Sequence, residues 1–378
     1  MKRLIKFTMF LLVVSVFLCS CKNGKADTSA NQGDTLTLNY AKRLSMHDFT
    51  DYTKVEVQNP WDTTRVLQTY LLVDRNKPLP NDLPKGVVVK VPLKKSVIYS
   101  AVHCSLVDEL GAFNSIAGVC ELKYMNLLKV HDAAKKGTII DLGDGLAPDI
   151  ERMIDLMPDA LLLSPFENSG GHGRVEQLGV PIIECADYME TTPLGRAEWM
   201  RFYGRLFGVA EKADSLFAQV EKKYKELAQI AQKATDRPTV ISELKTGSAW
   251  YVPGGNSWIS FFYRDAGADY LFKDDRHSGS VPLSFETVFD RGQKADFWLI
   301  KYNQTIDKTY RALEKEYAPY AGFNAFQKKK IYGCNTNYIA YYEEIPYHPD
   351  LFLKDLIKIF HPTLLPEHSL RFFTNLAD

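Results

Sequence analysis

The stretch that decides the fold of this chain is APDIERMIDLMPDALLLSP, residues 147–165. Apolar residues recur at helical spacing in its first half, Pro158 ends the helix, and an apolar strand over residues 160–163 follows directly. A helix that leads at once into a buried strand is half of the repeating unit of an α/β protein. Glu151 lies in the first helical turn, where a carboxylate interacts favourably with the helix dipole.

The same alternation of strand and helix surrounds this stretch. Apolar runs that predict buried strands are followed by amphipathic runs that predict short helices. The further strand candidates are residues 96–102, 116–120 and 181–186. The helix candidates lie in residues 105–116, where Gly111 ends the helix, and in residues 173–180. Strands and helices at this spacing predict a parallel α/β unit over residues 96–208.

The flanking regions predict three more units. Residues 36–95 alternate apolar and polar side chains in short runs separated by turn residues, which indicates a β-rich N-terminal extension. Residues 196–234 are helical in two pieces divided at Gly208, and no Gly or Pro interrupts residues 209–235. That second piece predicts one long, rigid connecting helix. Strand–helix alternation then resumes over residues 236–378, which predicts a second α/β unit.

The second unit repeats the opening stretch imperfectly. LSFETVFDRGQKADFWLIKYN, residues 283–303, again has a Glu in the first helical turn, Glu286, and an Asp before the strand, Asp296. The distance from helix to strand differs by two residues. The pattern fits a duplicated unit, and it also fits two ordinary αβ units with Glu at a favourable helix position.

The N-terminus has the features of an export signal. Residues 1–20 combine a basic start with an apolar run that is too short to stay in a bilayer. LCSC, residues 18–21, resembles the bacterial lipobox, which implies cleavage before Cys21 and lipidation of its thiol; the alternative is a plain secretory signal with an incidental cysteine. Residues 21–35 then predict a flexible tether.

Charge and cysteine content narrow the possible partners. Lys+Arg and Asp+Glu number 46 each, and loss of the signal leaves 43 bases against 46 acids, so nothing favours nucleic acid as a partner. Cys104, Cys120, Cys185 and Cys334 remain in the mature chain. Their spacing matches no zinc motif, and we predict neither a metal site nor a particular disulfide.

From about Val97 to Leu365 the chain resembles the class III substrate-binding proteins of ABC importers, which carry vitamin B12, ferric siderophores and haem. The resemblance is carried in order by the opening strand and helix, the 147–165 stretch, VEQLGVPII, the long helix and the 283–303 stretch. It implies two Rossmann-like lobes joined by one helix, with a ligand cleft between them. It also implies that Glu151 and Glu286 form salt bridges with arginines of the membrane permease.

The ligand would meet the loops beyond the carboxyl ends of the strands, and these loops are rich in aromatic and basic residues. Tyr124 and Phe166 fall where corrinoid binders of the family carry aromatic contacts, histidines could coordinate iron, and Arg276 could pair with an anion. Each could instead be a packing or surface residue. The ligand candidates are His103, Tyr124, Phe166, His172, Trp250, Tyr251, Trp258, Arg276, His277, Asn303, Tyr341 and Tyr342.

Three functions remain open at this point. The leading hypothesis is a periplasmic, lipid-anchored binding protein that delivers an iron complex or a corrinoid to an ABC permease, with no cofactor and no catalytic residues. An enzyme such as a chelatase on the same scaffold would use a cleft residue set for which His103 and Cys104 are the nearest candidates. A surface lipoprotein that captures ligand for an outer-membrane receptor would leave both glutamates without a role.

Overall fold

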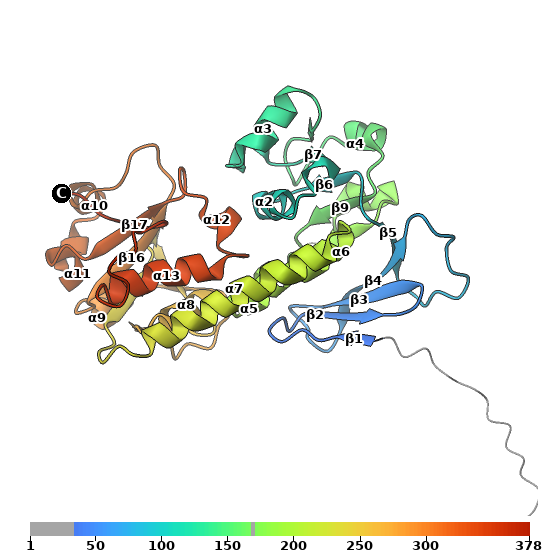
Figure 1. Ribbon diagram of the computed structural model, residues 1–378. Coiled ribbons are helices and arrows are strands. Elements are labelled where there is room, and N and C mark those ends of the chain that lie inside the picture. The colour runs from blue at the N-terminus through green and yellow to red at the C-terminus, as the bar shows by residue number, and fades with distance from the viewer. Residues whose placement is uncertain (1–33, 168–170) are drawn as a thin grey trace, which may run out of the picture.

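The computed structural model describes residues 34–167 and 171–378. The expected signal peptide, Cys21 and residues 22–33 of the expected tether lie outside this part of the chain. Figure 1 shows three packed parts, namely a small sheet at the N-terminal end and two α/β lobes, which the long helix α7 connects.

The N-terminal extension is a five-stranded sheet in the order β1-β2-β3-β4-β5. Its strands are antiparallel except for the parallel pair β4–β5. They are β1 (Asp34–Leu36), β2 (Leu44–Asp48), β3 (Tyr52–Gln58), β4 (Val66–Asp74) and β5 (Val87–Val91). The inner face of this sheet shares one hydrophobic core with the first lobe, and the Tyr70 hydroxyl donates to the carbonyl of Ile182 at 2.9 Å. The extension is therefore an integral layer of the first lobe.

The first lobe, which we call the N-lobe, contains an all-parallel sheet in the order β10-β9-β6-β7-β8. Its strands are β6 (Ser96–Ile98), β7 (Ile116–Val119), β8 (Ile140–Asp141), β9 (Ala160–Leu163) and β10 (Ile182–Glu184). The helices are α2 (Ala101–Glu109), α3 (Leu128–Lys135), α4 (Ile150–Leu156) and the 3₁₀ helix η3 (Gly173–Leu178). Because β6 is the first strand of this lobe, the strand order reverses between β6 and β9, as in a Rossmann fold.

Two details of the N-lobe differ from expectation. The strand expected over residues 96–102 ends at Ile98, and α2 begins at Ala101, because His103, Cys104, Leu106 and Val107 form a buried helical face. Residues 173–178 form a 3₁₀ helix where an α-helix was expected. This segment is short and largely exposed, so little packing favours the longer α-helical turn.

The connection between the lobes is helical, as predicted. It is α7 (Ala210–Ala231), and the last two N-lobe helices, α5 (Pro193–Glu198) and α6 (Met200–Leu206), lead into it. Gly208, at φ +71°, takes the left-handed conformation that separates α6 from α7. Helix α7 ends four residues before the expected limit, as the chain turns toward Pro238 and the next strand.

The second lobe, the C-lobe, has the sheet order β14-β11-β16-β17-β18, parallel except for β18. Its strands are β11 (Thr239–Ser242), β14 (Asp269–Tyr270), β16 (Phe297–Tyr302), β17 (Ile331–Asn335) and β18 (Thr374–Asn375). A small antiparallel sheet adds β12 (Lys245–Thr246), β13 (Ala249–Pro253) and β15 (Ser280–Leu283). The helices are α8 (Trp258–Asp265), α9 (Phe285–Gly292), α10 (Tyr310–Glu316), α11 (Asn324–Gln327), α12 (Tyr341–Glu344) and α13 (Pro349–Phe360).

The predicted fold class is confirmed: two Rossmann-like α/β lobes are joined by one long helix and carry a β-rich N-terminal extension. In the C-lobe the strand order reverses between β11 and β16, so each lobe has a switch point where a ligand crevice is expected. None of the helices in the described part of the chain combines the length and apolar composition needed to cross a membrane.

Candidate ligand-binding site

A cavity of about 530 Å³ lies between the lobes, at both switch points. On the N-lobe side it is lined by Ser100, just after β6, and Ser164, just after β9. On the C-lobe side it is lined by Glu243, just after β11, and Lys301 in β16. The carboxyl ends of the reversing strands of both lobes thus meet at one space, which is where open α/β sheets bind ligands.

Arg196, from the N-lobe helix α5, lines this cavity and stacks on Trp258, from the C-lobe helix α8. The guanidinium carbon lies 4.2 Å from the centroid of the Trp258 ring. Within the described residues no hydrogen bond from the guanidinium is found, and its Nε is buried without a partner. Burial lowers the pKa of Arg196, and Asp187 acts in the opposite direction. A half-buried guanidinium whose Nε–H is unpaired at a cavity wall is suited to bind an anionic group.

Behind Arg196 lies a buried polar network around Asp187. His103 Nε2 lies 3.0 Å from Asp187 Oδ1, and the Tyr203 hydroxyl donates to the same oxygen at 2.8 Å. Desolvation alone would raise the pKa of Asp187, but the charge and hydrogen bond of His103, together with the charge of Arg196 and the Tyr203 hydrogen bond, outweigh it, so this pKa lies below its usual value. Asp187 therefore already has two close partners, which leaves the Arg196 donors available.

The C-lobe wall carries an ion pair between Lys301 and Glu243. Desolvation alone would lower the pKa of Lys301, but the charge of Glu243 outweighs it and raises that pKa. Two tyrosines complete this wall: Tyr341 is 2% exposed and Tyr342 is 59% exposed. The two tyrosine rings pack edge to face next to the Lys301–Glu243 ion pair. Together they form a surface suited to a large ligand that has both apolar and polar parts.

A second cavity, of about 620 Å³, adjoins the first on the N-lobe and shares Ser100 and Ser164 with it. Phe166, which is 50% exposed, and His172 line it. His172 Nε2 lies 2.9 Å from Glu184 Oε1, so this nitrogen is engaged within the lobe. The second cavity extends the cleft along the N-lobe surface.

The structure brings half of the predicted ligand residues to these cavities. His103, Trp258, Tyr341 and Tyr342 line the first cavity, and Phe166 and His172 line the second. His103 differs from expectation in that it lies on helix α2, not in a loop, and is only 2% exposed. The Asp187 contact holds it inside the lobe.

The other six predicted ligand residues line neither cavity. Trp250 is fully buried in the C-lobe core, and its Nε1 donates to the Ser242 carbonyl at 3.0 Å. The others lie on the surface: Tyr124, Tyr251, Arg276, His277 and Asn303. His277 pairs with Asp275, and the Asn303 amide donates to Thr336.

Several residues that line the first cavity were not predicted from sequence patterns, and Arg196 is the most informative of them. The sequence predicts that Arg196 lies in the helical region before Gly208, and it gives no reason to expect Arg196 at a ligand site. One signal was available: α5 follows the carboxyl end of β10 after the 3₁₀ helix η4 (Ala186–Met189), and it starts at a Thr192 N-cap with Pro193 in its first turn. The other missed lining residues include Asp187, Tyr188, Glu190, Glu243 and Lys301.

The two glutamates that the family resemblance singled out are exposed on different lobes. Glu151 lies in the first turn of α4, whose N-cap Asp149 accepts a hydrogen bond from Arg152 N. Glu286 lies in the first turn of α9, which Ser284 caps in the same way through Thr287 N. Its own backbone N–H and the Ser284 hydroxyl lower the pKa of Glu286. Both carboxylates are therefore on rigid, capped helices.

The cysteines and possible metal ligands are also placed. Cys104, Cys120, Cys185 and Cys334 are buried and free. Burial raises the pKa of the Cys104 thiol well above its usual value, so this thiol stays protonated. Within residues 34–167 and 171–378, no group of three or more His, Cys, Asp or Glu side chains is arranged to hold a metal ion.

Comparison with known proteins agrees with this architecture. The chain is 22% identical to the uncharacterised lipoprotein MJ0878 of Methanocaldococcus jannaschii, over 99% of this chain and 96% of that one. It is 26% identical to the uncharacterised lipoprotein MJ0872 of the same organism, over 78% of this chain and 76% of that one. Neither name identifies a ligand.

Solved structures share the fold. A periplasmic haem-binding protein from Pseudomonas aeruginosa has a TM-score of 0.58 at 18% identity, covering 76% of this chain and 99% of that one. Helicobacter pylori CeuE has a TM-score of 0.58 at 15% identity, covering 83% of this chain and 90% of that one. A possible iron-binding protein from Staphylococcus epidermidis has a TM-score of 0.57 at 16% identity, covering 71% of this chain and 99% of that one.

The decisive comparison is with a family model. Residues 97–338, which run from β6 through the connecting helices to the end of β17 and just beyond, match the model of the periplasmic binding protein family. The match includes both switch points, α7 and both capped helices that carry Glu151 and Glu286. This chain belongs to the periplasmic binding protein family.

Proposed function

We propose that this protein is the lipid-anchored substrate-binding component of an ABC importer, and that it captures an anionic iron complex, such as a ferric siderophore or haem, in the inter-lobe cavity. The observation that carries the ligand class is Arg196, a cavity-lining guanidinium without a hydrogen-bond partner among the described residues. Siderophores and haem present carboxylate or catecholate oxygens, whereas the rim of a corrinoid consists mainly of neutral amides. The corrinoid is therefore the alternative ligand.

The titration that tests this proposal uses the mature protein with haemin, a ferric tris-catecholate complex and cobalamin. We expect a change in the absorbance band of the iron complex that binds, with a matching calorimetric signal. Tighter binding of cobalamin than of both iron complexes would overturn the assignment to an anionic ligand. No binding of any of the three would overturn the proposed ligand classes altogether.

Docking to a permease is the second part of the proposal, with Glu151 and Glu286 as the contacts. Supporting it, both carboxylates are exposed on capped helices of different lobes. Ile154, one turn from Glu151 on α4, is 56% exposed, and an apolar side chain beside a charge is typical of a protein contact surface. Two separated charges would fix the orientation of the protein on its partner.

Charge reversal tests docking separately from capture. The double variant Glu151→Arg/Glu286→Arg should bind ligand as the wild type does and should abolish uptake in cells, because both contacts become repulsive. A matched control is Glu211→Arg, which reverses an exposed first-turn glutamate on α7 and should leave uptake unchanged. Normal uptake by the double variant would favour instead a surface lipoprotein that serves an outer-membrane receptor without a permease.

An enzymatic role has weaker support. The nearest candidates for a catalytic pair, His103 and Cys104, are both buried, and the Cys104 thiol is held in its protonated form. His103 is engaged by Asp187 inside the N-lobe. We therefore propose capture and delivery, not conversion, of the ligand.

A further inference from the structure

The segment that links β1 to β2 is bound in an unusual way to the side of the N-lobe that faces the connecting helix. We call this segment, residues 37–43, the N-terminal strap. Five consecutive backbone N–H groups of the strap donate to only two carboxylates. Asn39, Tyr40 and Ala41 donate to Glu198 at 3.0, 2.8 and 2.8 Å, and Lys42 and Arg43 donate to Glu190 at 2.9 Å each.

Both carboxylates are buried and depend on the strap for their hydrogen bonds. Glu198 is 0% exposed and Glu190 is 3% exposed. Besides the strap, Glu190 accepts from Trp199 Nε1 at 3.1 Å, and among the described residues Glu198 has only a long contact of 3.5 Å with Arg201. A buried carboxylate that loses its donors is strongly destabilised, so the segment that carries both glutamates is held in place by the strap.

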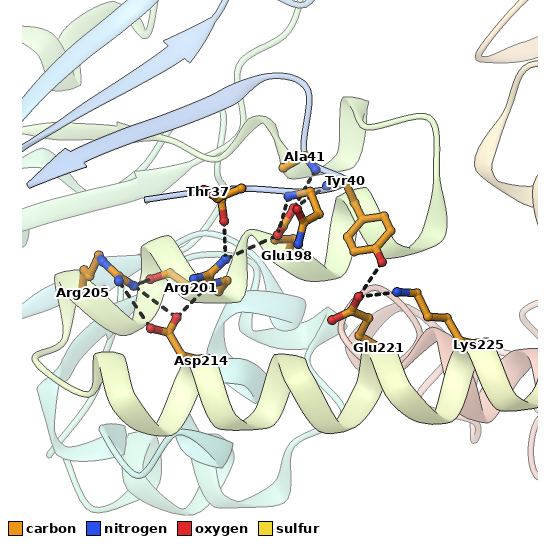
Figure 2. Close-up of polar contacts among 10 residues, drawn as sticks. Thr37, Tyr40, Ala41, Glu198, Arg201, Arg205, Asp214, Glu221 and Lys225 are labelled. Atoms are coloured by element: carbon orange, nitrogen blue, oxygen red, sulfur yellow. Dashed lines mark hydrogen bonds and ion pairs between the residues drawn. The ribbon is translucent and has the colours of Figure 1, made fainter. Parts of the chain in front are cut away.

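The strap also reaches the connecting helix, as Figure 2 shows. The Tyr40 hydroxyl donates to Glu221 of α7 at 2.5 Å, and Lys225, one turn along, donates to the same oxygen. Arg201 of α6 donates to the Thr37 carbonyl at 2.9 Å and to Asp214 of α7 at 2.9 Å. The strap is thus fixed to α5, α6 and α7 together, at the point where the N-lobe passes into the connector.

The same segment of the N-lobe forms a wall of the ligand cavity. Glu190 itself lines the cavity, and so does Arg196, which lies between the two strap-binding glutamates in the sequence. Contact between strap and helix is close here: a Cβ added at Gly195 would lie 3.0 Å from the Tyr40 carbonyl oxygen. The strap therefore supports α5 from one side while Arg196 of α5 lines the cavity.

We propose that the N-terminal strap is a positioning element of the ligand site: through Glu190 and Glu198 it holds residues 186–199, and with them Arg196, in the arrangement that receives the ligand. The proposal rests on the proposed function only in taking the inter-lobe cavity as the ligand site. It gives the N-terminal extension a role in binding, and it makes Glu190 and Glu198 positioning residues.

Hydrogen–deuterium exchange of the unliganded full chain tests this without any ligand. In Glu190→Gln and Glu198→Gln an amide N–H replaces an acceptor, so strap donors lose their partner. We expect exchange of residues 186–199 to be about tenfold faster in both variants. The matched control is Asp355→Asn, because Asp355 is 0% exposed and accepts from the backbone N–H of Arg371 and Phe372 in the C-lobe.

The control should show faster exchange near residues 355 and 371 and unchanged exchange over residues 186–199. Unchanged exchange over residues 186–199 in both glutamate variants, or equal loosening there in Asp355→Asn, would overturn the proposal. General destabilisation would affect all three variants alike, so a local effect is distinguishable from a loss of stability. This result does not depend on the identity of the ligand.

Binding of haemin or a ferric tris-catecholate complex, whichever the wild type binds, supplies the second measurement. Glu198→Gln and Arg196→Gln should each weaken binding about tenfold, and the double variant should weaken it by clearly less than the hundredfold product, because both act through one guanidinium. A hundredfold loss in the double variant would mean independent action and would contradict the proposal. If the wild type binds neither complex, the proposed function fails while the exchange measurement still decides the role of the strap.

Discussion

At the scale of single residues, Arg196 shows how a charge is kept available for a ligand. Asp187, the acid whose charge raises the pKa of Arg196, already accepts from His103 and Tyr203. Stacking on Trp258 covers one face of the guanidinium but leaves its in-plane N–H donors free, which is the arrangement that binds a bidentate oxygen anion. Because α5 belongs to the N-lobe and α8 to the C-lobe, the same residue also joins the two walls of the cavity.

We predict that Arg196→Lys weakens binding of an anionic iron complex about tenfold, although the charge is retained. Lysine presents a point charge and neither stacks on Trp258 as a planar group nor donates as a fork. Calorimetric titration with the ferric complex that the wild type binds measures the loss. Arg276→Lys is the control, since Arg276 is exposed and lines neither cavity; an equal loss in both variants would refute the role of Arg196.

The position of strand ends predicted part of the site, and side-chain direction explains part of what it missed. Loops after strands supplied Phe166 as a candidate, and Phe166 lines the N-lobe cavity. Trp250 and Tyr251 are ligand candidates on the same ground, a predicted loop after a strand. In the structure they lie within β13, where successive side chains point to opposite faces. Trp250 therefore enters the core at 0% exposure and Tyr251 points outward at 48%. Arg196 was missed because it falls in a predicted helix of the 96–208 unit, whereas the ligand candidates came from the loops that follow strands.

At the scale of elements, the imperfect repeat has a structural basis in both lobes. Asp159, before β9, accepts from the backbone N–H of Lys94 and Lys95, just ahead of β6, at 2.6 and 3.0 Å. Asp296, before β16, accepts from the backbone N–H and hydroxyl of Thr239, at the start of β11, at 2.9 and 2.7 Å. In each lobe this Asp fixes the start of the neighbouring parallel strand, at the amino ends of the two strands that flank the switch point.

We predict that Asp159→Asn and Asp296→Asn each lower the free energy of unfolding by about 1–3 kcal/mol, because backbone donors lose an acceptor. Desolvation alone would raise the pKa of Asp159, but the Lys94 and Lys95 N–H groups and Arg75 outweigh it and hold this pKa below its usual value. Its contribution is therefore present above about pH 3.9 and is lost as the pH falls through the lowered value.

Urea unfolding at pH 7 and at acid pH measures both effects. The Asp159→Asn variant should differ most from the wild type near neutral pH and least in acid. Asp155→Asn is a suitable control, because Asp155 is an exposed carboxylate on α4, close in sequence to Asp159. Equal stability of Asp159→Asn and the wild type at pH 7 would contradict the assigned role of this Asp.

The order of elements followed from the sequence more reliably than their ends did. The long run of apolar residues at helical spacing predicted α7. A helix that ends before Pro158, followed directly by the apolar strand β9, predicted the α/β class. The start of α2 was missed because the apolar residues of 96–102 belong partly to a buried strand and partly to a buried helical face, and a short apolar run has no distinct period. Tertiary burial, not local propensity, decides such a boundary.

At the scale of the whole molecule, polar contacts hold the lobes together beside the connecting helix. His348, next to the start of α13 in the C-lobe, has its Nε2 at 2.8 Å from Glu109 Oε2 on α2 of the N-lobe. Glu343 of α12 accepts from the backbone N–H of Asn126 at 3.2 Å. These contacts lie outside the cavity lining, so they set how the lobes meet without touching the proposed ligand.

The His348–Glu109 pair makes the stability of the joined lobes depend on pH. Desolvation alone would lower the pKa of His348, but the hydrogen bond and charge of Glu109 outweigh it, with help from Asp350 and Glu344, so the pKa is raised. A raised pKa in the folded state means that the contribution is complete below about pH 6.5 and is lost as the pH rises through the raised value.

We therefore predict that the wild-type protein loses up to about 1 kcal/mol of unfolding free energy across this window, and that His348→Gln removes this part of the pH dependence. Urea midpoints between pH 6 and pH 8.5 measure it. His277→Gln is the matched control, because His277 pairs with Asp275 on the surface of one lobe only. If the pH slope of His348→Gln equalled that of the wild type, the charged pair would contribute nothing to holding the lobes together. If only His348→Gln flattened the slope, a single inter-lobe ion pair would link the packing of the two lobes to pH, apart from any ligand bound between them.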